Sequence, residues 1–147
     1  MKVYLDTGCL GRLTDDQSQP GIREEAEAVE RILTLVQNGA AEWVASEALL
    51  DEVCRNPSVE RRLEGEALLT LASEAIEIGA GIGRRAKRLA SAGYGAYDAL
   101  HLAAAESAGA DVLLSTDDRC IKRVARGAGH PRVPVRNPVS WLQEQRS

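Results

Sequence analysis

Short apolar or β-branched runs alternate with amphipathic segments along the whole chain of 147 residues. The runs that we expect to form strands are Lys2–Leu5, Glu42–Ala45, Ala75–Ile78, Asp111–Ser115 and Val133–Val135. Strands separated by helices favour a parallel sheet with helices on both faces. In such α/β folds, functional residues gather beyond the C-terminal ends of the strands.

The segments between these runs predict helices. The clearest is Ile22–Gln37, whose apolar residues recur at helical spacing on one stripe. The others are Glu47–Arg55, Val59–Ser73, Gly81–Ala92, Tyr97–Ala108, Asp118–Arg126 and Pro138–Gln145. Asp6–Gly8 is expected as a turn, and Gly11–Pro20 as a loop that acts as a lid or only connects two elements. Since no repeat or linker interrupts the pattern, we expect residues 1–147 to form a single domain.

The composition excludes several classes of protein. Hydrophobic residues make up 44% and charged residues 27% of the chain, a balance typical of globular proteins rather than of disordered ones. No apolar run approaches the roughly 18 residues of a membrane span, and the N-terminus does not resemble a secretory signal. The three cysteines are widely spaced, and there are two histidines. We therefore expect a cytoplasmic protein without a disulfide framework, a Cys-rich zinc site or a membrane association.

Charge is distributed unevenly, although the net charge is only −4. Residues 1–80 hold 7 Lys/Arg and 16 Asp/Glu, whereas residues 81–147 hold 11 and 6. An acidic half and a basic half facing each other across a cleft would suit a phosphate-bearing ligand. Solvated helix faces explain the same pattern.

Four acidic residues fall near the C-terminal ends of predicted strands. They are Asp6, Glu52, Asp98 and Asp117. Taken singly, each has an ordinary explanation as a helix cap, a turn residue or a surface charge. Together, four carboxylates at one edge repel each other, and a fold keeps such a cluster when a cation neutralises it. Oxygen ligands without thiolate or imidazole suit Mg²⁺ or Mn²⁺, and a hard metal beside carboxylates suits phosphodiester hydrolysis.

Four segments of the chain resemble the signature segments of the PIN domain, a family of metal-dependent nucleases that includes the VapC-type toxins. They are Y-L-D-T from Tyr4, S-E-A-L-L-D-E-V from Ser46, Y-D-A-L-H-L-A from Tyr97 and L-S-T-D-D-R from Leu114. The third and fourth segments, at their observed interval, are the most specific. The resemblance implies a three-layer sandwich around a parallel five-stranded sheet of order 3-2-1-4-5, with helices on both faces.

The resemblance also implies roles for the four acids. Asp6, Glu52, Asp98 and Asp117 match the family's catalytic and metal-binding positions. Glu47 and Asp51 are rivals to Glu52, which is preferred for its interval from Ser46.

Three further residues are expected to support the four acids. They are Thr7, Ser115 and Asp118, the last of which is also a rival to Asp117. The chain departs from the family where Ser115 replaces the usual threonine, which keeps the hydroxyl. It departs again at Gly8, where a small polar residue is usual, and we expect the loop there to be looser.

Family likeness implies a Mg²⁺- or Mn²⁺-dependent endoribonuclease in which metal-activated water attacks the phosphodiester and leaves a 3′-hydroxyl and a 5′-phosphate. It also implies a homodimer and an antitoxin protein whose segment blocks the acidic crevice. Lys and Arg supply most of the sequence-independent affinity for nucleic acid. The candidates are Arg119, Arg84, Arg85 and Arg88, with Lys122, Arg123 and Arg126 on the same basic helix as Arg119. Tyr94 and Tyr97, which flank Asp98, are candidates for stacking on a base.

Three other enzyme or nucleotide-binding classes are disfavoured by their motifs, and one alternative outside enzymes is kept. A haloacid-dehalogenase-like phosphatase uses D-x-D after its first strand, and here Gly8 holds the third position. A receiver domain needs a pair of acids where Asp6 is single, and the segment Gly79–Gly83 is too short for the Rossmann fingerprint. A catalytically silent PIN-like module that docks RNA or a protein partner is the alternative outside enzymes.

Overall fold

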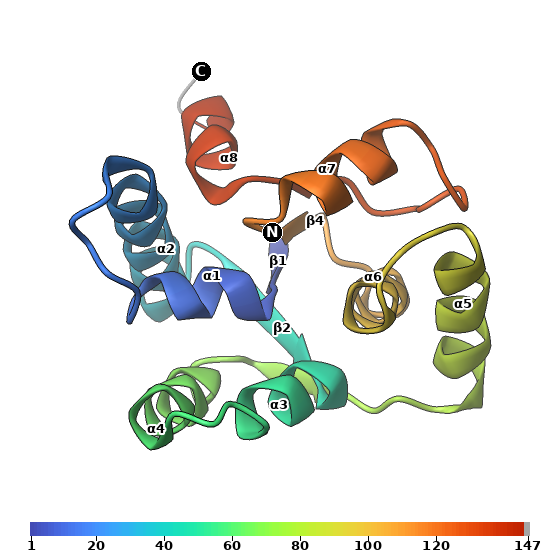
Figure 1. Ribbon diagram of the computed structural model, residues 1–147, viewed down its shortest axis with the longest axis horizontal. Coiled ribbons are helices and arrows are strands. Elements are labelled where there is room, and N and C mark those ends of the chain that lie inside the picture. The colour runs from blue at the N-terminus through green and yellow to red at the C-terminus, as the bar shows by residue number, and fades with distance from the viewer. Residues whose placement is uncertain (146–147) are drawn as a thin grey trace.

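The computed structural model describes residues 1–145 and contains a parallel sheet of five strands (Figure 1). The strands are β1 (Lys2–Leu5), β2 (Glu42–Ser46), β3 (Glu74–Ile76), β4 (Val112–Leu114) and β5 (Val135–Arg136), in the order β3-β2-β1-β4-β5. All neighbouring pairs run parallel, with Val3 opposite Trp43 on one side and Val112 on the other. The α/β class, the parallel pairing and the strand order 3-2-1-4-5 are confirmed.

Helices cover both faces of the sheet (Figure 1). They are α1 (Thr7–Arg12), α2 (Pro20–Gln37), α3 (Glu47–Cys54), α4 (Val59–Leu69), α5 (Ala80–Ser91), α6 (Ala96–Ala108), α7 (Asp118–Ala125) and α8 (Pro138–Gln145). Apolar residues of α1, α2, α3, α4 and α8 pack on one face, and those of α5, α6 and α7 pack on the other. The expected three-layer arrangement follows from this division.

The central strand β1 sends its side chains alternately to the two faces, as a pleated strand must. Val3 and Leu5 join the core under α2, whereas Tyr4 joins the core under α6. All three side chains are fully buried, and so is Trp43 on β2. Among the helices of residues 1–145, none is both long and apolar enough to cross a bilayer.

Two predictions for the segment after β1 are wrong. The residues expected as a turn, Asp6–Gly8, instead begin α1, because the Asp6 carboxylate accepts a hydrogen bond from the Cys9 backbone N–H and caps the helix. The predicted loop Gly11–Pro20 is shortened at both ends, since α1 extends to Arg12 and α2 begins at Pro20. Proline suits the first turn of a helix because its missing N–H has no partner there.

The last strand also differs from its prediction. Val133 is buried in the core, but β5 comprises Val135–Arg136. Pro134 has no N–H to donate to a neighbouring strand, although its carbonyl accepts from Leu113 at 2.9 Å. The other boundaries shift by a few residues; for example, α4 ends at Leu69 rather than Ser73.

Candidate active site

Four acidic side chains lie around the C-terminal end of β1, each brought there by a different element. Asp6 follows β1, Glu52 lies on α3 after β2, Asp98 lies in the first turn of α6, and Asp117 follows β4. Because β1 lies between β2 and β4, connections leave it on opposite sides. This is the point where ligands of open α/β sheets bind. The topology therefore brings the four predicted acids to one edge of the sheet.

Asp6 and Asp117 are tied to the backbone as the caps of two helices. The Asp6 Oδ1 accepts from Cys9 N at 2.9 Å, and the Asp117 Oδ1 accepts from the N–H groups of Arg119 and Cys120 at 2.9 and 3.3 Å. Asp6 is buried, and burial raises its pKa, although hydrogen bonds from Ser115 and Cys9 oppose that effect. Backbone capping thus fixes where these two carboxylates lie.

Ser115 links the two caps, as its hydroxyl was expected to support the acids. The side chain is buried, accepts a hydrogen bond from Asp117 N at 3.0 Å, and stabilises the ionised Asp6 by a side-chain hydrogen bond. The Ser115 hydroxyl therefore contacts both capping residues. Asp118 is exposed in the first turn of α7 and has no hydrogen bond or ion pair within residues 1–145.

Asp98 has no such support. No donor within residues 1–145 forms a hydrogen bond to its carboxylate, which is partly buried. Burial, followed by the negative charges of Asp117 and Asp6, raises the pKa of Asp98 to about 6, and Glu52 adds to this effect while His101 opposes it. The acids therefore lie close enough to repel each other, and this repulsion contributes to the raised pKa of Asp98.

The Cys120 thiol is also affected by three of the acids. Burial raises the pKa of Cys120 to about 12, and the charges of Asp98, Asp117 and Asp6 contribute in that order. Three carboxylates from different elements thus act on a single buried atom.

Glu52 is held by two side-chain donors. Its Oε1 accepts a short hydrogen bond from Thr7 Oγ1 and one from His101 Nε2 at 2.8 Å. Burial would raise the pKa of Glu52, but the hydrogen bonds from His101 and Thr7 outweigh it, and the pKa is lowered. Thr7 was expected to support the site, whereas His101 was missed. Its signal was its spacing, since Asp98 and His101 are three residues apart and share a helix face.

The rivals to Glu52 lie on other sides of α3. Asp51 is exposed, and its Oδ2 accepts from the Tyr97 hydroxyl at 2.6 Å and from Arg55 Nε at 2.9 Å. Glu47 is exposed in the first turn. Of the three acids on this helix, the structure brings Glu52 to Thr7 and His101.

Gly8 lies in a helix rather than in the expected loop. It lies in the first turn of α1, where a Cβ atom would be 2.6 Å from Thr116 Oγ1 and 3.4 Å from Asp6 Oδ1. The Thr116 side chain therefore fills the space that a larger residue at position 8 would need.

The donor set fits a hard divalent ion in chemistry, although within residues 1–145 no three Asp, Glu, His or Cys side chains form a ready-made metal cluster. Both oxygens of Asp98, Oδ2 of Asp117 and Oε2 of Glu52 have no hydrogen-bond donor within the described chain, whereas the Asp6 carboxylate is shared with Cys9 N and Ser115. Carboxylate oxygens with excess negative charge are the ligands that Mg²⁺ and Mn²⁺ take. Asp6, Asp98, Asp117 and Glu52 would hold the ion.

The predicted nucleic-acid contacts separate into two groups. Arg119 is exposed and follows Asp117 and Asp118 directly, at the acidic edge. On α5, Arg84 and Arg88 are exposed, but Arg85 forms a bidentate pair with Glu106 at 2.8 and 3.0 Å.

The position of Glu106 places Arg85 away from the acids. Glu106 lies near the C-terminal end of α6, about 12 Å along the helix axis from Asp98 at 1.5 Å per residue. The prediction that Tyr94 stacks on a base is wrong, because Tyr94 is buried and its hydroxyl donates to the Ala128 carbonyl. Tyr97 is partly exposed, but its hydroxyl donates a hydrogen bond to Asp51.

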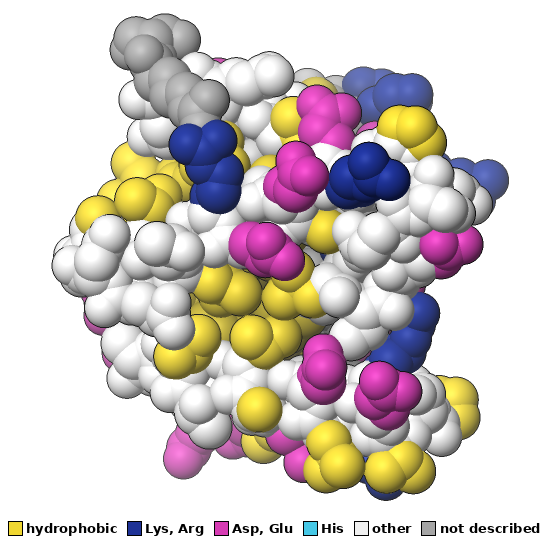
Figure 2. Space-filling model, turned by 90° about the vertical axis from the view of Figure 1, so that its left-hand side faces the viewer, with side chains coloured by type: hydrophobic (Ala, Val, Ile, Leu, Met, Phe, Trp, Pro, Cys, Tyr) yellow, Lys and Arg dark blue, Asp and Glu magenta, His cyan; other side chains and the backbone are white. Residues whose placement is uncertain are grey.

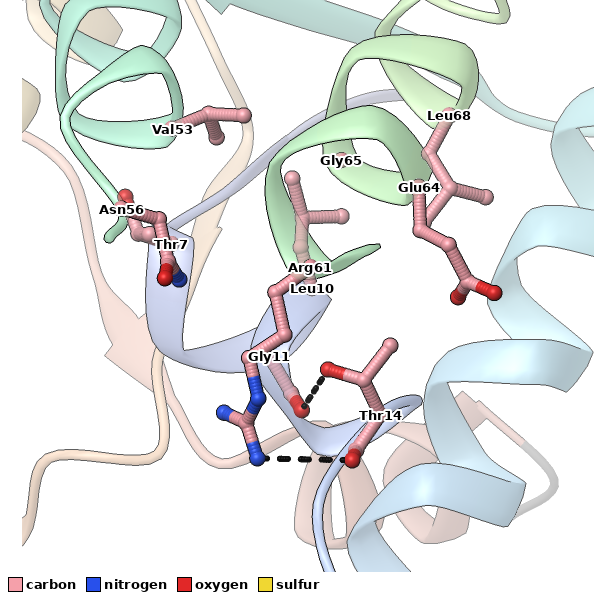
Figure 3. A pocket seen from close by; sticks show the side chains of 10 residues that line it. All are labelled: Thr7, Leu10, Gly11, Thr14, Val53, Asn56, Arg61, Glu64, Gly65 and Leu68. Carbon is pink, nitrogen blue, oxygen red and sulfur yellow. Dashed lines mark hydrogen bonds between the residues drawn. The ribbon is translucent and has the colours of Figure 1, made fainter. Parts of the chain in front are cut away.

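A pocket opens beside Thr7, between α1, α3 and α4 (Figure 3). Leu10, Val53 and Leu68 contribute its apolar lining, and Figure 2 shows apolar side chains in a hollow on the side of the molecule formed by α2 and α4. The segment after α1 borders this pocket and is anchored, since Asp15 pairs with both Arg12 and Arg61 at 2.7 and 2.9 Å.

The sequence profile of one family, described as the PIN domain, matches residues 3–127. No relative was found among curated proteins. Solved structures are similar to the chain in fold. VapBC2 from Rickettsia felis, bound to a DNA fragment from its promoter, has a TM-score of 0.61 at 17% identity over 93% of this chain and 98% of its own.

Two further structures give similar values. VapBC-1 from nontypeable Haemophilus influenzae has a TM-score of 0.62 at 18% identity, over 94% of this chain and 98% of its own. VapC20 from Mycobacterium tuberculosis, a toxin that cleaves the sarcin-ricin loop, has a TM-score of 0.60 at 14% identity, over 87% and 97%.

Proposed function

The chain belongs to the PIN-domain family, and on that premise we propose that it is a Mg²⁺- or Mn²⁺-dependent endoribonuclease that hydrolyses RNA phosphodiester bonds. The observation that carries the proposal is the convergence of four acids from different elements on one edge of the sheet, and its clearest consequence is at Asp98. Its carboxylate lies among like charges with no donor within residues 1–145, and its pKa is raised to about 6. A divalent cation removes this repulsion, which a surface without a ligand would have no reason to keep.

Each residue of the proposed site has a separate role. Hydrogen bonds from backbone N–H groups hold the Asp6 and Asp117 carboxylates in place, and Ser115 contacts both residues. Glu52 is oriented by Thr7 and His101. A bound Mg²⁺ or Mn²⁺ supplies Lewis acidity and lowers the pKa of water. We assign Asp118, adjacent to Asp117 and free in the described chain, to a hydrogen bond with a water of that site.

The phosphates of the substrate are assigned to basic residues. Arg119 is exposed beside the acids and is the residue expected to contact the scissile phosphate. Arg84 and Arg88 lie exposed on α5 and would contact more distant phosphates. We give Arg85 no part in binding, because its guanidinium already pairs with Glu106 and donates to the Gly129 and His130 carbonyls.

An antitoxin segment is the proposed protein partner, and a homodimer the proposed assembly. The similar structures from Rickettsia felis and Haemophilus influenzae are VapBC structures, which supports a two-protein system. The pocket of Figure 3 opens beside Thr7, the donor to Glu52, and Arg61 and Glu64 are among the residues that line it.

Cleavage of total RNA tests the proposed function. Purified protein should degrade RNA in the presence of Mn²⁺ and should stop when EDTA is added. The Asp98→Asn variant should be inactive, whereas Glu47→Gln, which removes an exposed acid of α3, should cleave as wild type does. Activity that persists in EDTA, or in Asp98→Asn, would refute metal-dependent cleavage at these acids, and a wild-type protein that does not cleave RNA with Mn²⁺ would favour a silent binding module.

A further inference from the structure

A continuous chain of hydrogen bonds leads from the core of the molecule to Glu52. Its members lie on four elements: Ser46 at the end of β2, Tyr4 on β1, His101 on α6 and Glu52 on α3. The Ser46 Oγ and the Tyr4 hydroxyl are 2.6 Å apart, the Tyr4 hydroxyl and His101 Nδ1 are 2.7 Å apart, and His101 Nε2 and Glu52 Oε1 are 2.8 Å apart. Ser46, Tyr4 and His101 are all buried.

Which group donates in each hydrogen bond follows from the groups at the two ends of the chain. At the inner end, Ser46 Oγ accepts from Leu49 N at 3.2 Å. At the outer end, the Glu52 carboxylate only accepts, so His101 Nε2 must carry a hydrogen. If Nδ1 is bare, it accepts from Tyr4, whose oxygen then accepts from the Ser46 hydroxyl. In this arrangement every hydrogen of the chain has an acceptor.

The reverse arrangement, with a hydrogen on Nδ1, does not balance, because it either leaves a bare Nε2 facing the Glu52 carboxylate or makes the ring doubly protonated. A hydrogen on Nδ1 would be donated to Tyr4, and Tyr4 would donate to Ser46. The Ser46 hydroxyl hydrogen would then have no acceptor within residues 1–145, at a site with no solvent exposure. A buried unsatisfied donor is costly, on the order of 1–3 kcal/mol. The environment therefore selects the tautomer with its hydrogen on Nε2.

Packing holds the imidazole in the same orientation. Tyr4 contacts it from the core, with ring centroids 5.5 Å apart, and Tyr97 stacks on it from outside at 6.2 Å and 23° between planes. The ring therefore presents a fixed donor to Glu52, a flexible side chain that keeps 30% of its surface exposed.

We propose that His101 is a positioning residue that occupies one oxygen of Glu52 and leaves the other for the divalent ion, with Tyr4 and Ser46 setting the direction of its hydrogen bond. The metal role rests on the function proposed above, but the hydrogen-bond chain is a property of the metal-free protein. Partners that orient ligand side chains typically change metal affinity about 10- to 100-fold when lost.

Calorimetric titration with Mn²⁺ alone tests the metal role. His101→Leu should bind Mn²⁺ about 10- to 100-fold more weakly. His101→Gln, whose side-chain amide can still donate to Glu52, should recover part of that loss. A folded His101→Leu protein with wild-type Mn²⁺ affinity would overturn the proposal, and so would a His101→Gln protein no better than a folded His101→Leu. If His101→Leu does not fold, His101→Gln and Tyr4→Phe carry the test.

Nitrogen NMR of the His101 ring in the metal-free protein tests the chain itself. Wild type should show a hydrogen on Nε2 and a bare Nδ1. Tyr4→Phe and Tyr97→Phe each remove one hydroxyl from a ring beside His101, but only Tyr4 belongs to the chain. A mixture of tautomers and weaker Mn²⁺ binding are expected in Tyr4→Phe, and neither in Tyr97→Phe.

Failure of the hydrogen-bond chain and failure of the proposed function give different results. A hydrogen on Nδ1 in wild type, or equal tautomer ratios in Tyr4→Phe and wild type, would overturn the chain. Wild-type protein that binds no Mn²⁺ while its His101 shows the expected tautomer would refute the proposed function and support the hydrogen-bond chain.

Discussion

The helices α3 and α6 present their acids to the site in opposite ways. Glu52 on α3 receives two side-chain hydrogen bonds, and its pKa is lowered. Asp98 on α6 receives none within residues 1–145, and its pKa is raised to about 6. The two carboxylates therefore differ both in their hydrogen-bond donors and in the charges beside them, since Asp117 and Asp6 raise the pKa of Asp98.

The contrast shows that hydrogen bonds fix the position of Glu52, whereas Asp98 contributes an uncompensated negative charge. Glu52 is stable without a ligand because its donors compensate for burial. Asp98 is not compensated, and its repulsion from Asp117 and Asp6 is energy that a cation recovers on binding. We therefore expect Asp98 to contribute most to the stabilisation that a metal ion gives, and Glu52 to contribute most to where the ion is held.

The largest effect is expected on catalysis from Asp98→Asn. The amide keeps the shape of the side chain but removes the charge, so cleavage of RNA with Mn²⁺ should fall to background. Asp51→Asn is the matched control, because Asp51 is exposed and bonded to Tyr97 and Arg55. Substantial cleavage by Asp98→Asn would show that Asp98 is not needed for catalysis, and its difference from Glu52 would then have no functional meaning.

Metal binding should stabilise the folded protein. A ligand that binds only the native state at 100 times its dissociation constant raises the free energy of unfolding by about 2.7 kcal/mol. Thermal melting with and without Mn²⁺ measures this gain, which should be smaller in Asp98→Asn than in wild type. An equal gain in both proteins would mean that the ion binds elsewhere.

The metal-free protein should lose stability as the pH rises, because of Asp98. Its pKa is raised from 3.8 to about 6 in the folded state, so the folded protein binds the proton more tightly than the unfolded chain does. The cost of charging is absent below about pH 4 and complete above about pH 6, where it amounts to about 2 kcal/mol after solvent screening.

Asp98→Asn should therefore be more stable than wild type in urea at pH 8 and equal to it at pH 4. Wild-type and variant curves that coincide at pH 8 would show that Asp98 is not destabilised.

The smallest effect is expected at Glu52. Glutamine at this position still accepts from Thr7 and His101, so the side chain should keep its place while the charge is lost. A tenfold or larger loss in cleavage rate, about 1.4 kcal/mol, is expected for Glu52→Gln, and less than twofold for Glu47→Gln. Rates measured on one RNA oligonucleotide settle the order, and the reverse order would reassign the ligand to Glu47.

The four acids were predictable from sequence because a simple rule places them. In a parallel sheet, a residue after a strand lies at the C-terminal edge, and Asp6 and Asp117 each follow an apolar run directly. The helix α1 was missed because its start depends on one capping bond from Asp6 rather than on an apolar period.

The partners of the acids could not be predicted in the same way. Tyr4 and His101 are 97 residues apart, and nothing in either local pattern indicates that their side chains meet. The basic face of α5 was visible in the sequence, but the carboxylate opposite Arg85 lies on α6, and only packing reveals it. Pairings between elements depend on how helices lie on the sheet, which periodicity does not specify.

The helix caps at Asp6 and Asp117 have an evolutionary consequence. Asparagine caps helices as well as aspartate does, since its side-chain oxygen accepts the same backbone hydrogen bonds. A single-base change converts an Asp codon to an Asn codon. One mutation at either position would therefore remove a carboxylate while keeping the N-terminal cap of its helix, so a lineage of this domain could lose the proposed activity in one step without losing its fold.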